Sequence, residues 1–184
     1  MRSMRPLRLL LTLAACGPQW TTIEQSGPPS KLRGVTAITV AFDFSELLVG
    51  DTPLESYLAA LPLSRRAELE RVLRVMADGF LAELIVNLPI SVTPAEGPAA
   101  EGEVRVTARF RAMELGQYRI DRRIDSQLVT DILWSIGGTP TDAIRTRTRV
   151  QANRSQSSPL ARMQLAAGEA AELAAAFFEL EQTR

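Results

Sequence analysis

The sequence of 184 residues contains no histidine, one cysteine and one lysine. Without histidine the chain cannot form a Ser-His-Asp or Cys-His catalytic group, and it cannot bind zinc through histidine. A single cysteine excludes an internal disulfide and any metal site built from several cysteines. Lys31, the one lysine, lies in a Gly/Pro/Ser-rich segment, which argues against a Ser-Lys catalytic pair.

Other chemical motifs are also absent. There is no Gly-rich phosphate loop and no Asp-rich loop with calcium spacing. Glu114, Asp121 and Asp125 lie near one turn, and paired carboxylates hydrolyse sugars in some enzymes. Solvated loop acids are the simpler interpretation of these three residues. We therefore expect no catalytic residues, no metal, no cofactor and no enzymatic activity.

The composition is that of a globular domain, with 46% hydrophobic and 23% charged residues. The 21 basic residues balance the 21 acidic ones over the whole chain, but three of the arginines lie at the extreme N-terminus. Residues 16–184 thus carry a net charge of about −3, which provides no global attraction for nucleic acid. We expect no nucleic-acid partner.

The N-terminus has the layout of a secretory signal. Arg2, Arg5 and Arg8 form a basic start without an acid, and residues 9–15 are apolar except for Thr12. This run is too short to cross a bilayer, which needs about 20 residues. Residues 1–15 are therefore predicted to be a signal peptide.

The residues Leu13-Ala14-Ala15-Cys16 resemble the lipobox of bacterial lipoproteins, and the motif holds the only cysteine of the chain. This resemblance implies that diacylglycerol is attached to the Cys16 sulfur, that the signal is cut before Cys16 and that the new amine is acylated. Several acyl chains give stable membrane anchoring. The alternatives are an ordinary cleaved signal, or a frayed start with a buried cysteine.

Gly17 is the residue that follows the lipidated Cys16. In enterobacterial lipoproteins, Asp at this place favours retention in the inner membrane. The resemblance therefore implies an outer-membrane lipoprotein that faces the periplasm. Residues 16–34 are rich in Gly, Pro and Ser and are predicted to form a flexible tether, about 20–25 Å in r.m.s. length. Trp20 is expected either to dock on the domain or to lie at the lipid headgroups.

Residues 35–184 are predicted to form one α+β domain. Strands are expected at 35–44, 89–93, 103–112, 127–136 and 143–152, the last two joined as a hairpin through Gly137 and Gly138. Helices are expected at 52–60, capped by Thr52, at 65–87, capped by Ser64, and at 158–181. The order strand-helix-strand-strand-strand-helix favours a mixed or antiparallel sheet of 4–5 strands with two long helices packed on one face.

This arrangement resembles, by architecture only, a group of small lipoproteins of envelope assembly. The group includes activators of peptidoglycan synthases, the curli-secretion lipoprotein and the lipoprotein partner of the lipopolysaccharide translocon. The resemblance covers roughly residues 35–181 and implies a protein that works by binding, although a shared fold alone does not determine function.

Arginine rows are the one unusual feature of the predicted strands. Arg105, Arg109 and Arg111 alternate on one strand and Arg145, Arg147 and Arg149 on another. If these strands are neighbours, six guanidinium groups share the face opposite the helices. Arginine binds phosphate and carboxylate in bidentate geometry, so this face is a candidate contact surface for anionic lipids, acidic glycans or an acidic partner. The alternative is a solvated face balanced by acids such as Glu103 and Asp131.

The sequence therefore predicts a lipid-anchored envelope protein that acts as a non-catalytic accessory or scaffold subunit in envelope assembly or transport. It would have a protein partner in the envelope. The alternative is a lipoprotein that binds lipid or glycolipid in a cavity between helices and sheet. A cavity lined by the stripe from Leu69 to Leu84 and the C-terminal helix favours that alternative, and a filled core favours the scaffold.

Overall fold

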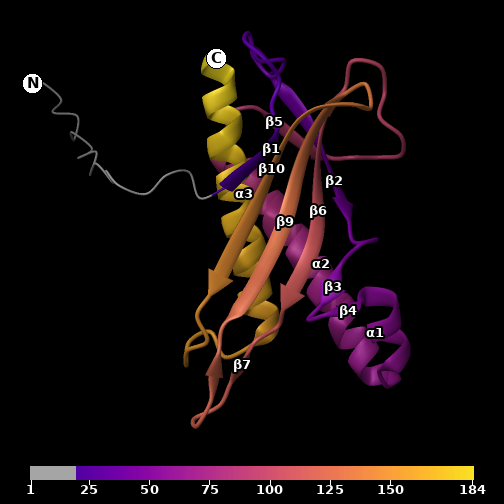
Figure 1. Cartoon of the computed structure of the whole chain (residues 1–184), viewed down its shortest axis with the longest axis vertical. Helices are drawn as coiled ribbons and strands as arrows, with labels where there is room; N and C mark the ends of the chain where they lie inside the picture. The colour runs from indigo at the N-terminus through magenta and orange to yellow at the C-terminus, as the bar shows by residue number, and fades with distance from the viewer. Residues whose placement is uncertain (1–19) are drawn as a thin grey trace, which may run out of the picture.

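The computed structural model describes residues 20–184, which form a mixed β-sheet with helices against one of its faces (Figure 1). The predicted signal peptide and Cys16 lie outside the described residues. The strands are β1 (Trp20–Glu24), β2 (Ala37–Asp43), β3 (Leu48–Val49), β4 (Thr52–Pro53), β5 (Ser91–Pro94), β6 (Val104–Glu114), β7 (Gln117–Tyr118), β8 (Arg123–Ile124), β9 (Ser126–Ile136) and β10 (Thr139–Val150). The helices are α1 (Leu54–Ala60), α2 (Leu63–Asn87) and α3 (Pro159–Thr183).

The main sheet has 8 strands, six of which follow the order β1-β10-β9-β6-β2-β5. The three longest strands, β6, β9 and β10, pair antiparallel at its centre, whereas β2 runs parallel to both β5 and β6. β3 extends the sheet beside the end of β6 and pairs with β4. β7 and β8 form a separate hairpin.

The α+β class agrees with the prediction, but the sheet is larger than the predicted 4–5 strands and the described residues contain three helices. The additional strands are short. β3 and β4 have two residues each, too few for any alternation to show in the sequence. β1 falls in a segment whose Pro and Gly content suggested a coil.

The predicted helix caps were wrong. Thr52 lies in β4, and Ser64 lies inside α2, which begins one residue earlier. Prolines occupy both N-cap positions, Pro53 for α1 and Pro62 for α2, and neither helix has a side-chain cap. Both helices therefore begin without a capping hydroxyl.

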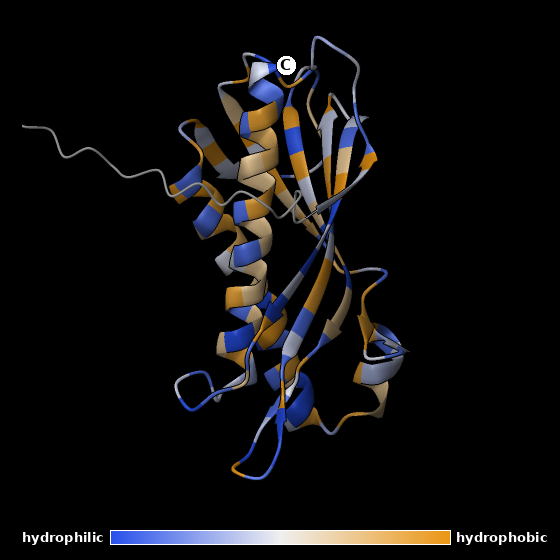
Figure 2. Ribbon diagram, turned by 60° about the vertical axis from the view of Figure 1, so that its left-hand side comes forward, coloured by the Kyte–Doolittle hydropathy of each residue, from blue (hydrophilic) through white to orange (hydrophobic). Residues whose placement is uncertain are grey.

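The core lies between the sheet and the helices (Figure 2). The two halves of the sheet contact different helices. On the β2–β6 half, Phe80 of α2 packs edge-on against Phe110, with ring centroids 6.4 Å apart. On the β9–β10 half, Phe177 of α3 lies 4.7 Å from Trp134. α2 and α3 approach each other closely at Gly79, where a Cβ atom would come within 2.9 Å of the Gln164 carbonyl oxygen.

The predicted flexible tether is wrong for residues 20–34, which belong to the folded domain. β1 pairs antiparallel with β10, and Trp20 contacts Phe177 edge-on at 6.1 Å between ring centroids. Leu32 is fully buried. Ser26 donates hydrogen bonds to Asp142 from both its backbone N–H and its hydroxyl. The domain therefore begins at Trp20 in the described part of the chain, and not at residue 35.

Two further details differ from the prediction. A β-bulge in β6 between Phe110 and Ala112 reverses the alternation of the predicted strand, so that Met113 is buried and Ala112 is only partly buried. Residues 116–125, where no strand was predicted, contain the β7–β8 hairpin. Within residues 20–184, no helix combines the length and the hydropathy that a membrane span requires.

Candidate functional site

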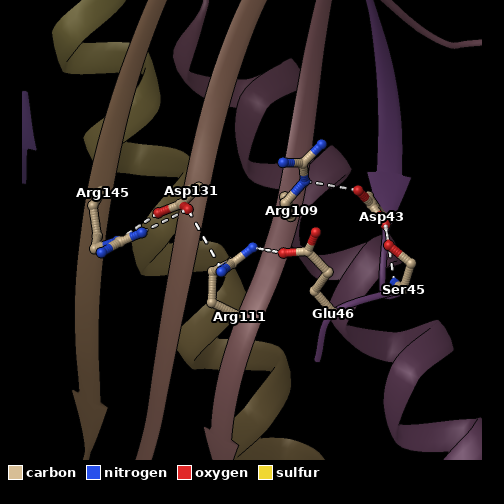
Figure 3. A network of polar contacts seen from close by, with 7 residues as sticks. All are labelled: Asp43, Ser45, Glu46, Arg109, Arg111, Asp131 and Arg145. Atoms are coloured by element: carbon tan, nitrogen blue, oxygen red, sulfur yellow. Dashed lines mark hydrogen bonds and ion pairs between the residues drawn. The ribbon is translucent and has the colours of Figure 1, made fainter. Parts of the chain in front are cut away.

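The six predicted arginines lie on β6 and β10, the two strands that flank β9. Figure 3 shows three of them, Arg109, Arg111 and Arg145, on the sheet face opposite the helices. The register places Arg109 and Arg145 on either side of Asp131. Because each step between strands is about 4.8 Å, the two arginine rows are about 10 Å apart. The structure thus brings the rows onto one face, with an acidic residue between them.

Asp131 is the centre of a charge network on this face. Arg145 donates two hydrogen bonds to its carboxylate, from Nε at 2.6 Å and from a terminal nitrogen at 2.8 Å. Arg111 lies on the other side, with its Nε 3.7 Å from the same carboxylate, and also pairs with Glu46. The pKa of Arg145 is raised, chiefly by its hydrogen bonds to Asp131.

Arg109 forms an ion pair with Asp43 of the neighbouring strand β2. Its Nε donates to the Asp43 carboxylate at 2.8 Å, and Ser45 caps the same carboxylate through its backbone N–H and its hydroxyl. Burial raises the pKa of Asp43, but the hydrogen bonds from Ser45 and Arg109 outweigh this effect and leave it below its usual value. Asp43, Arg109, Asp131 and Arg145 therefore form a row of alternating charge across four strands.

Glu103, directly before the first residue of β6, neutralises the charge of Arg105. Arg105 donates to Glu103 at 2.8 Å, and the Thr39 hydroxyl and the Ala100 N–H donate to the same carboxylate. The hydrogen bond from Thr39, followed by those from Ala100 and Arg105, lowers the pKa of Glu103 to about 2. The expectation that Glu103 and Asp131 act as local counter-charges is confirmed.

Arg149 pairs with Asp125 at 2.8 Å, so that five of the six arginines have an acidic partner. Asp125 also accepts a hydrogen bond from the Ala152 N–H, and its pKa is lowered by these contacts. Within residues 20–184, Arg147 is the one member of the two rows without a salt bridge. The face has little excess positive charge, and its role as a contact surface stays a prediction.

Arg162, on α3, is a polar residue that the sequence analysis missed, and it is fully buried. Its guanidinium donates to the Ser126 hydroxyl and to the carbonyl oxygens of Leu115, Gln156 and Ser157. Burial lowers its pKa, an effect that Asp125 partly offsets. The available signal was its helical spacing, since Arg162 precedes Ala166 and Ala170 on the buried alanine stripe of α3.

The structure also contains a groove that was not predicted from the sequence. It lies between α1, the first turns of α2 and α3, and the end of β6, with a volume of about 770 Å³. Its lining is largely apolar and includes Tyr57, Leu61, Val72, Leu115 and Leu160. A second hollow of about 580 Å³ adjoins it and extends to Tyr118 and Ile124 of the β7–β8 hairpin. The groove was not predictable from local patterns, because its walls come from four separate segments of the chain.

Residues 20–184 contain no cluster of three or more acidic, Cys or His side chains that is placed to hold a metal ion. Two of the acids near the turn have different surroundings. Asp125 is engaged by Arg149 and Ala152, while Asp121 is exposed at the tip of the hairpin.

The sequence matches no protein-family profile and no curated protein. Among solved structures, the chain is similar to the PelC dodecamer from Paraburkholderia phytofirmans, at 8% identity and a TM-score of 0.44, over 84% of this chain and 96% of that one. A single-substitution variant of the same PelC gives 10% identity and 0.41, over 84% and 95%. An uncharacterised protein gives 15% identity and 0.32, over 82% and 92%. At these values the likeness carries no argument about function.

Proposed function

We propose that this chain is a lipid-anchored protein of the bacterial cell envelope that acts as a non-catalytic accessory or scaffold subunit. The observation that carries the proposal is the N-terminal pattern: a basic start, an apolar run and the residues Leu13 to Cys16, with the only cysteine of the chain at the acceptor position. Gly17 favours the outer membrane, with the domain in the periplasm.

The start of the folded domain fits an anchor at Cys16. Trp20 is the first described residue and is already paired with Thr146 in the sheet. Four residues of fully extended chain span at most about 14 Å. A lipidated Cys16 would therefore hold the domain close to the bilayer, without the long flexible tether that the composition suggested. The binding surfaces for a partner in the envelope would act near the membrane.

Metabolic labelling with a clickable fatty acid tests the anchor. The wild-type chain is expected to incorporate the label and to fractionate with membranes, and Cys16→Ser is expected to lose both. Label that persists in Cys16→Ser would overturn the anchor. Crosslinking and pull-down from native membranes, with both forms, then tests the accessory role, because an accessory subunit needs a stable partner.

A lipid- or glycolipid-binding lipoprotein is the second candidate, and the groove favours it. The stripe from Met76 to Leu84 is filled by core packing, which fits the scaffold, but the first part of the stripe opens into the groove of about 770 Å³ at Leu69 and Val72. That volume lies in the range of small-molecule sites, which are mostly apolar.

Filling the groove tests this candidate. Ala67 is an exposed residue of α2 that lines the groove, so Ala67→Trp occupies the space without disturbing the core. Ala82→Trp, at an exposed position of the same helix outside the groove lining, is the matched control. If the groove holds lipid, mass spectrometry finds co-purifying lipid with wild type and the control but not with Ala67→Trp. Equal lipid in all three would exclude the groove as its site.

A further inference from the structure

The β7–β8 hairpin projects beyond the end of the sheet, away from the turn that joins β9 and β10 (Figure 1). Gln117 pairs with Ile124 and Tyr118 with Arg123. Reciprocal backbone hydrogen bonds between Arg119 and Arg122, at 2.8 Å and 3.3 Å, close the turn. Ile120 and Asp121 are thereby left at the tip.

Ile120 is 97% exposed, the largest exposure among the big apolar side chains of residues 20–184. Figure 2 shows the hairpin as mostly hydrophilic with a short hydrophobic stretch at its tip. An isolated exposed apolar residue is common on protein surfaces. Ile120, however, lies at the tip of a projecting hairpin. Its side chain can therefore insert into an apolar environment outside the protein.

Positive charge surrounds the apolar tip. Arg119, Arg122 and Arg123 are exposed and, within the described residues, have no salt bridge. Asp121 is the one acid of the hairpin strands and turn, which leaves them a net charge of about +2 in a domain whose net charge is about −3. The guanidinium of Arg123 lies 6.0 Å from the centre of the Tyr118 ring, and the residue is exposed.

The hairpin is fixed to the body of the domain at its base. The carbonyl oxygen of Leu115, at the start of the hairpin, accepts hydrogen bonds from the Ser126 hydroxyl and from buried Arg162. Gly116 has φ of +64°, and a Cβ atom there would come within 2.5 Å of the Ile124 carbonyl oxygen. The tip therefore has a defined direction relative to the sheet.

We propose that this hairpin docks on an anionic lipid bilayer, with Ile120 inserted among the acyl chains and Arg119, Arg122 and Arg123 bound to lipid phosphates. A protein partner would need a pocket for one narrow apolar tip, whereas a bilayer surface receives it anywhere. Arginine forms bidentate contacts with phosphate, and each basic residue near an anionic surface strengthens binding.

The direction of β1 indicates that the hairpin lies at the end of the molecule nearer to the proposed anchor. β1 runs antiparallel to β10, and Trp20 pairs with Thr146 while Glu24 pairs with Ala143. Trp20 is thus the end of β1 nearer to Val150 and to the hairpin. The docking surface deepens the proposed function, because an anchor at Cys16 would keep the hairpin near the membrane, but it is testable without the anchor.

Vesicle co-sedimentation tests the proposal with the full chain carrying Cys16→Ser, so that no acyl chain is attached. The vesicles contain phosphatidylethanolamine with or without phosphatidylglycerol. Replacing the three arginines by glutamine is expected to weaken binding to anionic vesicles on the order of 100-fold, given about fivefold per arginine. Ile120→Ser is expected to weaken binding by about tenfold, through the loss of the inserted side chain.

Two control variants are matched to the hairpin variants. One removes the same positive charge outside the hairpin, and the other removes an exposed apolar side chain outside it. Lys31, Arg33 and Arg74 are exposed basic residues outside the hairpin, and their joint change to glutamine removes the same charge. Val86→Ser removes a 77% exposed apolar side chain from α2. Both controls are expected to bind as the Cys16→Ser parent does.

Equal weakening by the hairpin and control sets would overturn the proposal, and so would full binding by the hairpin variants. Retained vesicle binding together with loss of a crosslinked envelope protein would assign the hairpin to a protein partner instead, and would also overturn it. Unfolding curves of each variant exclude a loss of fold as the cause. Since no variant is lipidated, failure here leaves the fatty-acid labelling of Cys16 as a separate result.

Discussion

The open face of the sheet and the β7–β8 hairpin both display arginine, but they use it differently. On the sheet, Arg109 and Arg145 each lie within 2.8 Å of an aspartate oxygen. On the hairpin, Arg119 and Arg122 contact each other only through their backbones. Identical side chains are thus neutralised in one region and left available in the other.

The difference shows that arginine count alone does not identify an anion-binding surface. Partly buried ion pairs stabilise the fold and reduce the attraction of the surface for external anions. The alternating order of Asp43, Arg109, Asp131 and Arg145 cancels charge along the row. Within residues 20–184, the hairpin keeps three arginines without a salt bridge beside Ile120, whereas the two rows on the sheet keep only Arg147.

Arg162 is buried and donates a hydrogen bond to Leu115 at the base of the hairpin. Its replacement is expected to have the largest effect on the free energy of unfolding. Arg162→Met removes the donor to the carbonyl oxygens of Gln156 and Ser157 and one of the two donors to that of Leu115, which keeps its bond from Ser126. We expect a loss of about 3 kcal/mol in the free energy of unfolding, measured with denaturant. Arg154→Met, at an exposed position in the nearby loop, is the control and is expected to change stability by less than about 0.5 kcal/mol. Equal stability of the two variants would contradict the role of Arg162.

Much of the fold was predictable because its long elements have clear periodicity. The strand predicted at 127–136 corresponds to β9 (Ser126–Ile136), and the Gly137-Gly138 turn joins it to β10 as expected. The tether was not predictable as folded structure, because the contacts that hold it are long-range. Ser26 meets Asp142, and Gln25 donates to buried Glu181.

The candidate site was predictable only in part. Alternation placed the six arginines on one face, and Glu103 and Asp131 were expected as counter-charges, but the partners Asp43, Glu46 and Asp125 were not predicted. Asp43 reaches Arg109 through the parallel pairing of β2 with β6, a register that the sequence does not encode locally. The hairpin was overlooked because each of its strands has two residues, so no alternation was visible.

Asp131→Asn tests the central ion pair and is expected to have the next largest effect. The carboxylate has a side-chain exposure of 9% and accepts hydrogen bonds from Arg145, with Arg111 close by. Removing its charge is expected to lower the free energy of unfolding by about 1.5 kcal/mol. Asp78→Asn, an exposed position of α2, is the control. A result within error of that control would mean that the network is too solvated to stabilise the sheet.

Glu103 provides a test by pH. Its folded pKa, about 2, lies below the ordinary value of 4.5, so its contribution to stability is complete above pH 4.5 and is lost as the pH falls towards 2. The difference in unfolding free energy between wild type and Glu103→Gln is therefore expected to shrink over this range. Thr39→Val removes the main cause of the shift and is expected to raise the pKa of Glu103 in an NMR titration. An unchanged pKa would exclude Thr39 as that cause.

Arg147 and Arg145 give the closest comparison, with the smallest expected effect. They lie on the same face of β10, two residues apart, and differ in that Arg145 is bonded to Asp131. Arg145→Gln is expected to cost about 1 kcal/mol of unfolding free energy and Arg147→Gln less than about 0.5 kcal/mol. If Arg147→Gln also leaves vesicle and partner binding unchanged, the sheet face is a structural surface. A loss of binding at unchanged stability would instead make Arg147 the contact residue of this face, because it is the arginine there whose donors are not already engaged.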